Sequence, residues 1–259
     1  MRALFLCILA CGCGSVAADV HEVTTSDGHG DVAKASPYPL DDTLRLHQVQ
    51  ALGTHNSYHL RPRRLWDPSH DYEHASLDVQ LNDQGVRQLE IDVHLRADGE
   101  LEVFHLPLVD SETSCKRFVD CLGLIKTWSD AHPQHMPILV WVEPKDDLDF
   151  AEPDYRSLDG ELNRLDTEIL SVFPRAQIVV PDDIRGDRSS LSDAVVVDGW
   201  PTLGEMRGKV LFALLDSGRH RESYLLGAEN LAGKVLFVDS DSTEQPFAAM
   251  FKIDNAPAE

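Results

Sequence analysis

The chain has 259 residues, and its 23 Lys and Arg against 44 Asp and Glu give a formal net charge of −21 at pH 7. This charge argues against a nucleic-acid partner, because the phosphate backbone needs cationic side chains, and against adsorption to anionic lipid through a basic patch. Dense carboxylates instead suit a divalent cation. A hydrophobic share of 42% and a charged share of 26% are ordinary for a folded domain and exclude global disorder.

Residues 1–18 have the pattern of a short signal peptide: Arg2, an apolar run, and then small residues. Cleavage after Ala17 or Ala18 fits this pattern, and lipoprotein processing at Cys11 is the alternative. The apolar run is shorter than the roughly 20 residues that span a bilayer, and no later segment approaches that length. We therefore expect a secreted or cell-envelope protein without a transmembrane span.

Cysteine usage agrees with an oxidising compartment. Three of the five cysteines lie in the leader, which leaves Cys115 and Cys121 in the body of the chain. A pair six positions apart in a secreted chain predicts one local disulfide, with two free buried thiols as the alternative. A zinc site built on these two cysteines is disfavoured, because no second cysteine pair completes four ligands.

In chain order, residues 19–43 are rich in Asp, Ser and Gly and predict a flexible linker, and residues 44–259 are expected to form the folded domain. Expected strands lie at 49–52, 86–93, 101–104, 136–142, 178–180, 210–215 and 235–238, and expected helices at 77–81, 116–131, 158–173 and 202–207. Alternating strands and helices predict a parallel α/β sheet. In a (β/α)₈ barrel, active sites lie at the carboxyl ends of the strands.

Glu90 and Asp92 alternate with Leu89 and Ile91, so the two carboxylates share one face of a strand. Their desolvation is costly unless positive charge compensates it, and Ca²⁺ or Mg²⁺ takes oxygen ligands of this kind. The plain alternative is a pair of surface carboxylates on a half-exposed strand.

His55 and Asn56 follow the first expected strand, and His105 follows the third. An imidazole serves as general acid or base near neutral pH, and an amide oxygen suits a hard cation. A capping cluster at a helix start is the alternative for the first pair.

Glu143 and Lys145 end the most apolar strand. They suggest a metal ligand and an anion-binding group, or else a local ion pair at the surface. Together with the two histidines and the other carboxylates they supply the acid, the base and the positive charge that phosphodiester cleavage needs.

These motifs resemble the phosphatidylinositol-specific phospholipase C family, most of all its calcium-dependent bacterial-type branch. The resemblance runs from about Leu44 to Phe251 and rests on Gly53-Thr54-His55-Asn56-Ser57-Tyr58, Leu89-Glu90-Ile91-Asp92-Val93, Phe104-His105, Glu143-Pro144-Lys145, the Cys115/Cys121 spacing and the segment 199–209. It implies an α/β fold, a distorted TIM barrel of the PLC-like phosphodiesterase type. Family members continue for a further strand-helix-strand, so we expect a barrel that lacks its C-terminal closing strands.

The resemblance also implies roles for individual residues. His55 and His105 are similar to the catalytic histidines, and Lys145 to a substrate-binding lysine. The calcium ligands of the family correspond to Asn56, Glu90, Asp92 and Glu143. The implied reaction cleaves phosphatidylinositol at a membrane surface to diacylglycerol and a cyclic inositol phosphate.

Two other functions remain open from the sequence. A glycerophosphodiester phosphodiesterase uses a similar barrel, two histidines and a metal, but its first motif is His-Arg-Gly, whereas this chain has His55-Asn56-Ser57. A non-catalytic barrel that binds calcium or a lipid headgroup would not need both histidines. The polar loop after the first motif carries further histidines, among which the pattern does not choose, and Trp66, a residue type found at membrane interfaces.

Overall fold

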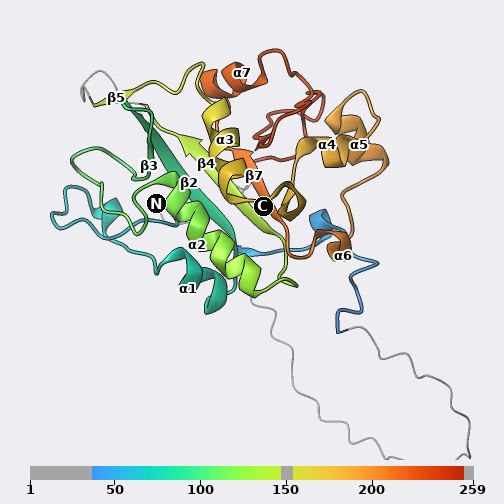
Figure 1. Cartoon of the computed structure of the whole chain (residues 1–259), viewed down its shortest axis with the longest axis horizontal. Coiled ribbons are helices and arrows are strands. Elements are labelled where there is room, and N and C mark those ends of the chain that lie inside the picture. The colour runs from blue at the N-terminus through green and yellow to red at the C-terminus, as the bar shows by residue number, and fades with distance from the viewer. Residues whose placement is uncertain (1–36, 147–153, 254–259) are drawn as a thin grey trace, which may run out of the picture. The chain divides into compact units, whose positions relative to one another are not determined.

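The computed structural model describes residues 37–146 and 154–253 (Figure 1). The predicted signal peptide and residues 19–36 of the predicted linker lie outside the described residues. The chain divides into two compact units, Met1–Pro39 and Leu40–Glu259. The second unit contains the sheet and all the predicted site residues.

A parallel sheet forms the centre of the second unit, as the alternation of strands and helices predicts. Its order is β1 (Leu52–Gly53), β2 (Val86–Arg96), β4 (Ile138–Pro144) and β7 (Val210–Leu214). Two short strands continue the far edge of β7: β6 (Ile178–Val179) pairs with its start and β8 (Phe237–Val238) with its end. Over the described residues this sheet does not close on itself, which fits a distorted TIM barrel.

Two antiparallel strands extend the carboxyl end of β2. They are β3 (Leu101–Glu102) and β5 (Tyr155–Arg156), which pair with different stretches of β2's last three residues. β2 is therefore longer than the parallel sheet requires, and it projects past the ends of β1 and β4.

The helices are α1 (Leu77–Asn82), α2 (Phe118–Ala131), α3 (Asn163–Val172), α4 (Pro181–Arg185), α5 (Leu191–Val197), α6 (Leu203–Met206) and α7 (Arg219–Leu225), and single 3₁₀ turns lie at Leu46–Gln48, Pro68–His70 and Arg175–Gln177. In Figure 1, α1 and α2 run along one side of the β2–β4 pair. The sequence predicted helices at the positions of α1, α2, α3 and α6. It did not predict the short helices α4, α5 and α7.

The core explains why β2 is so regular. Leu89, Ile91 and Val93 are fully buried and share one apolar cluster with Phe118 and Leu122 of α2. β2 pairs with β4 without a bulge from residue 88 to residue 93. The alternate residues Glu90 and Asp92 therefore face the opposite side of the sheet. The carboxylates are thus held inward by the burial of their neighbours.

The predicted disulfide is present. Cys115 and Cys121 are joined with an S–S distance of 2.05 Å. The bond ties the end of the loop after β3 to the first turns of α2, so the loop that carries His105 is anchored to the scaffold on its far side.

Candidate functional site

Three carboxylates from neighbouring strands meet at the carboxyl end of the sheet. Asp92 of β2 lies directly opposite Glu143 of β4 in the strand register, and Glu90 precedes Asp92 on the same face. One oxygen of each carboxylate lies within 4.8 Å of the others. Asp92 is completely buried, and neither of its oxygens, nor Oε1 of Glu90, has a hydrogen-bond partner among the described residues.

The electrostatics of this cluster favour a cation. Burial and, to a smaller extent, the charge of Glu143 together raise the pKa of Glu90 to about 7. Burial also holds the pKa of Asp92 well above its usual range, although Lys145 opposes this effect. Carboxylates that are buried without hydrogen bonds are stabilised by a cation, and an all-oxygen donor set suits Ca²⁺. The residues present therefore fit calcium.

Asn56 lies beside the carboxylates on the loop after β1. Its φ of 47° is in the left-handed region, which asparagine tolerates better than most residues. The buried amide is oriented by two tyrosines: Nδ2 donates to Tyr72 Oη at 3.1 Å, and Oδ1 accepts from Tyr58 Oη at 3.4 Å. The next residue fixes the loop to β2, because the Ser57 amide donates to the Glu90 carbonyl and the Ser57 hydroxyl accepts from the Glu90 amide.

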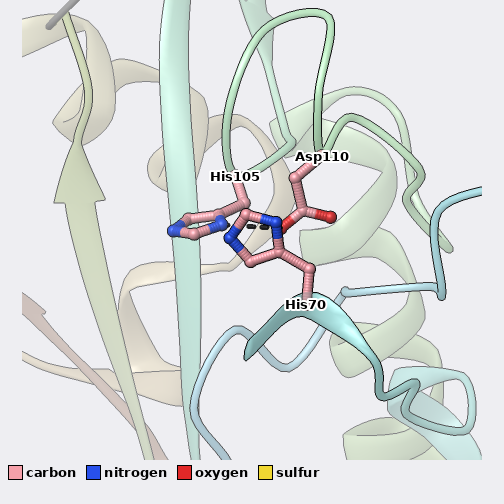
Figure 2. Close-up of side chains that lie close together, drawn as sticks. All are labelled: His70, His105 and Asp110. Carbon is pink, nitrogen blue, oxygen red and sulfur yellow. Dashed lines mark hydrogen bonds and ion pairs between the residues drawn. The ribbon is translucent and has the colours of Figure 1, made fainter. Parts of the chain in front are cut away.

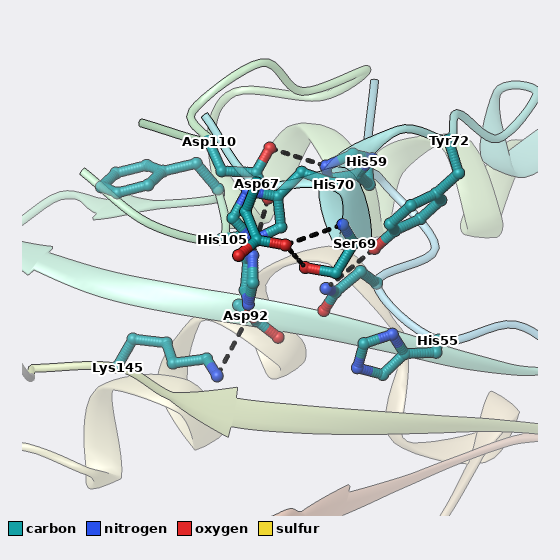
Figure 3. A network of polar contacts seen from close by, with 12 residues as sticks. His55, His59, Asp67, Ser69, His70, Tyr72, Asp92, His105, Asp110 and Lys145 are labelled. Carbon is teal, nitrogen blue, oxygen red and sulfur yellow. Dashed lines mark hydrogen bonds and ion pairs between the residues drawn. The ribbon is translucent and has the colours of Figure 1, made fainter. Parts of the chain in front are cut away.

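His55 lies on the same loop, immediately before Asn56, and points toward the same carboxylates (Figure 3). Its Nε2 is 3.4 Å from Oε1 of Glu90, and its side chain is 69% exposed. Burial of part of the His55 side chain lowers its pKa, and the positive charges of His105 and Lys252 lower it further. The imidazole is therefore neutral near pH 7 and able to accept a proton.

Lys145 follows β4 and closes the other side of the cluster. Its ammonium donates to Oε1 of Glu143 at 2.7 Å and lies 3.4 Å from Oδ2 of Asp92. Burial alone would lower the pKa of Lys145, but these two carboxylates outweigh it and raise the pKa.

His105 reaches the site because the chain reverses after β2. As expected, it lies just past the strand that follows, β3, which runs antiparallel to β2 with Leu101 opposite Leu95. The tight turn at 97–100 reverses the chain, so the segment after β3 runs back along β2. His105 thereby returns to the neighbourhood of Asp92, as Figure 3 shows.

Asp110 holds His105 in one orientation (Figure 2). Its Oδ2 lies 2.7 Å from Nδ1 of His105, and its Oδ1 lies 2.7 Å from Nε2 of His59. Although burial by itself would raise the pKa of Asp110, the hydrogen bonds from His105 and His59 outweigh it and hold the pKa at about 2. An ionised carboxylate only accepts hydrogen bonds, so Nδ1 of His105 carries the proton and Nε2 is left for chemistry.

Three residues that the sequence did not select connect the two halves of the site (Figure 3). Asp110 holds His59, the His59 ring stacks on Tyr72 at 4.1 Å, and Tyr72 accepts the hydrogen bond from the Asn56 amide. His59 is 51 positions away from Asp110 along the chain, on a loop without periodicity, so no sequence pattern indicates this pairing. The structure thus brings all seven predicted residues to one end of the sheet and adds this connecting group.

The sequence profile of the family described as "Phosphoinositide phospholipase C, Ca2+-dependent" matches residues 44–101 and 95–259. No curated protein matches the sequence.

Solved structures share the fold. A calcium-dependent phosphoinositol-specific phospholipase C from Pseudomonas sp. is 22% identical in its myoinositol complex, with a TM-score of 0.58 over 78% of this chain and 68% of that one. One of its apo crystal forms is 20% identical, with a TM-score of 0.56 over 78% and 67%. A Ca²⁺-dependent phosphatidylinositol-specific phospholipase C from Streptomyces antibioticus is 23% identical, with a TM-score of 0.54 over 76% and 71%.

Proposed function

This chain belongs to the Ca²⁺-dependent phosphoinositide phospholipase C family, and on that premise we propose that it cleaves phosphatidylinositol with His55 and His105 as its acid–base pair. It is accordingly a phosphoric diester hydrolase whose cofactor is calcium. The observation that carries the catalytic proposal is the contact between Nδ1 of His105 and the buried carboxylate of Asp110, which leaves a single nitrogen of His105 available to deliver a proton.

In the proposed reaction, the 2-hydroxyl of inositol attacks phosphorus, and the bond from phosphorus to the diacylglycerol oxygen breaks. Neutral His55 accepts the proton of the attacking hydroxyl, and Nε2 of His105 donates a proton to the departing oxygen. The products are diacylglycerol and a cyclic inositol phosphate. The negative charge of Asp110 stabilises the protonated form of His105 before the transfer.

Calcium would be held by four residues: Asn56, Glu90, Asp92 and Glu143. When bound, such an ion offsets the charge on the phosphate and lowers the pKa of a coordinated hydroxyl. The Lys145 ammonium, which already neutralises part of the carboxylate cluster, would turn its remaining N–H groups toward a phosphate oxygen.

Substrate choice separates this proposal from a glycerophosphodiester phosphodiesterase. We expect the purified protein to hydrolyse intact phosphatidylinositol and to leave glycerophosphoinositol nearly untouched, with the released phosphates resolved by ³¹P NMR. Preference for glycerophosphoinositol would favour the rival function.

A variant separates catalysis from binding. His105→Ala is expected to reduce turnover by about 100-fold or more and to leave calcium affinity, measured by calorimetry, as in the wild type. His47→Ala, on the exposed 3₁₀ turn Leu46–Gln48, is the matched control. Turnover that survives in His105→Ala would contradict the catalytic assignment.

Exposed apolar residues near the site support a membrane surface as the place of reaction. Leu108 is 81% exposed at the tip of the loop that joins His105 to Asp110, and Trp66 is 57% exposed on the loop before His70, with the Arg64 guanidinium over its ring. We propose that these side chains enter the lipid surface and bring His105 to the headgroups. Among the described residues, no helix combines the length and the apolar character that crossing a membrane requires.

We further propose export through the leader at residues 1–18, with the catalytic domain at 44–259 beyond a linker at 19–43. Mass spectrometry of the exported protein tests this proposal. A new N-terminus at Ala18 or Asp19 would indicate a secreted product, and a lipid-modified Cys11 would indicate an envelope lipoprotein. An intact Met1 in the exported fraction would contradict both.

A further inference from the structure

Nδ1 of the partly exposed His70 is a buried polar atom that the proposed mechanism does not use. His70 ends the 3₁₀ turn Pro68–His70, and its ring lies edge-to-face against His105 at 5.4 Å between centroids. Its Nδ1 faces Oδ2 of Asp110 at 3.7 Å, beyond hydrogen-bond distance, and has no hydrogen-bond partner among the described residues. A buried imidazole nitrogen aimed at a carboxylate without bonding it needs an explanation.

We propose that His70, His105 and Asp110 form a second metal site that binds Zn²⁺ and inhibits the enzyme (Figure 2). One ligand atom of each residue lies within 4.8 Å of the other two. Two imidazole nitrogens and one carboxylate oxygen are a donor set that zinc accepts, with a fourth position left for water. The nitrogen donors distinguish this site from the all-oxygen carboxylate cluster that suits calcium.

The surroundings of Asp110 resemble an outer shell for a bound metal. His59 holds the second oxygen of the carboxylate at 2.7 Å, and the His59 ring is itself fixed by stacking on Tyr72. Oδ2 is therefore held in place, facing both His70 and His105. Such outer-shell contacts orient metal-binding carboxylates and raise affinity.

Zinc would enter by replacing a proton. The proton between Nδ1 of His105 and Oδ2 of Asp110 would be released to solvent, and zinc would bridge the two atoms. Tetrahedral ligands about 2.0 Å from the metal lie roughly 3.3 Å apart, so the present 2.7 Å contact must widen and the 3.7 Å contact of His70 must shorten. The first change is about 0.6 Å and the second about 0.4 Å, in opposite directions.

Bound zinc would remove the hydrogen bond to Asp110 on which the proposed role of His105 depends. The charge of Asp110 would be committed to the metal and no longer stabilise a protonated His105, and the ring would be fixed toward His70. Inhibition rests on the proposed function, whereas zinc binding does not, so the two are measured separately.

Binding is tested by titrating ZnCl₂ into the full chain in saturating CaCl₂, which fills the carboxylate cluster. We expect one zinc ion and about one released proton per chain, read by calorimetry in buffers of different ionisation enthalpy. His70→Gln should lower zinc affinity at least about tenfold, and His47→Gln, on an exposed turn, should leave it unchanged. The zinc concentration for half-inhibition, relative to each variant's own zinc-free rate, should rise by the same factor in His70→Gln only.

X-ray absorption on the zinc-loaded wild type keeps the proposal testable if His70→Gln does not fold. Two imidazole ligands at about 2.0 Å support the site. Oxygen ligands alone, no zinc binding in saturating calcium, or unchanged affinity in a folded His70→Gln protein would overturn it. Tight zinc binding to an active enzyme without loss of rate would overturn the inhibitory role. Zinc binding through two imidazoles in a chain that cleaves no phosphoinositide would refute the proposed function and retain the site.

Discussion

Nδ1 of His105 lies 2.7 Å from Oδ2 of Asp110, and the same carboxylate accepts from His59 through its other oxygen. The Asp110 side chain is completely buried, and its pKa of about 2 keeps it ionised. One buried charge therefore fixes both the ring orientation and the tautomer of the proposed general acid. Through His59 and Tyr72 it also connects to the amide of Asn56.

Asp110→Asn is expected to lower kcat about 100-fold while KM changes little. The amide keeps the shape of the side chain but removes the charge that stabilises protonated His105 during the transfer. Steady-state kinetics on phosphatidylinositol vesicles measures both constants. Asp71→Asn, on a partly exposed residue paired with Arg61, is the control. A kcat near that of the wild type would show that Asp110 only supports the loop.

Glu143→Gln is expected to weaken calcium binding by at least about tenfold. The change removes a negative oxygen from the ligand cluster, directly opposite Asp92 in the strand register. Calorimetry gives the affinity, and raising calcium should recover turnover in this variant. Glu244→Gln, on an exposed turn, should behave as the wild type. Equal calcium affinity in Glu143→Gln would remove that residue from the ligand set.

The free energy of unfolding should depend on pH through His220 of α7, which contacts Asp146 just past the end of β4. Burial alone would lower its pKa, but hydrogen bonds to Asp216 and Asp146 outweigh burial and raise it. A raised histidine pKa stabilises the folded state fully below the unfolded value of about 6.5, and this contribution is lost as pH rises through the folded value.

Urea unfolding in saturating calcium at pH 6 and pH 9 tests this sign. The wild type should exceed His220→Gln in unfolding free energy by about 1–3 kcal/mol at pH 6, and by less at pH 9. His132→Gln, which removes a histidine stacked on Trp128 outside the site, is the comparison. An identical pH dependence in His220→Gln would contradict the prediction.

Trp66→Ala is expected to weaken binding to phosphatidylinositol vesicles several-fold, because an indole in the interface is replaced by a small side chain. Sedimentation with vesicles measures binding, and hydrolysis of a water-soluble short-chain phosphatidylinositol measures the site without a membrane. The second rate should be unchanged. Trp200→Ala is not a suitable control, because that side chain is buried in the core. Equal vesicle binding by Trp66→Ala and the wild type would contradict the docking proposal.

The sequence predicted what regular elements position. Alternation in β2 placed Glu90 and Asp92 on one face, because a strand repeats every two residues and the intervening apolar residues must be buried. The spacing of the two cysteines predicted the disulfide, which the structure contains. The family resemblance stated from the motifs is confirmed by the family profile.

The sequence could not predict what loops position. Asp110 and His59 lie on separate loops without periodicity, and their contact depends on how the turn after β2 sends the chain back over the sheet. Hairpin geometry is local, but the contacts it creates across 51 positions are tertiary.

The most direct test of the account is hydrolysis of phosphatidylinositol vesicles by the purified full chain, first with calcium and then with excess chelator. We expect cyclic inositol phosphate and diacylglycerol to appear with calcium, and their release to stop in chelator and resume when calcium is restored. Equal release in chelator would contradict the calcium-dependent mechanism. No release in either condition, from a folded protein that binds calcium, would contradict the catalytic function itself.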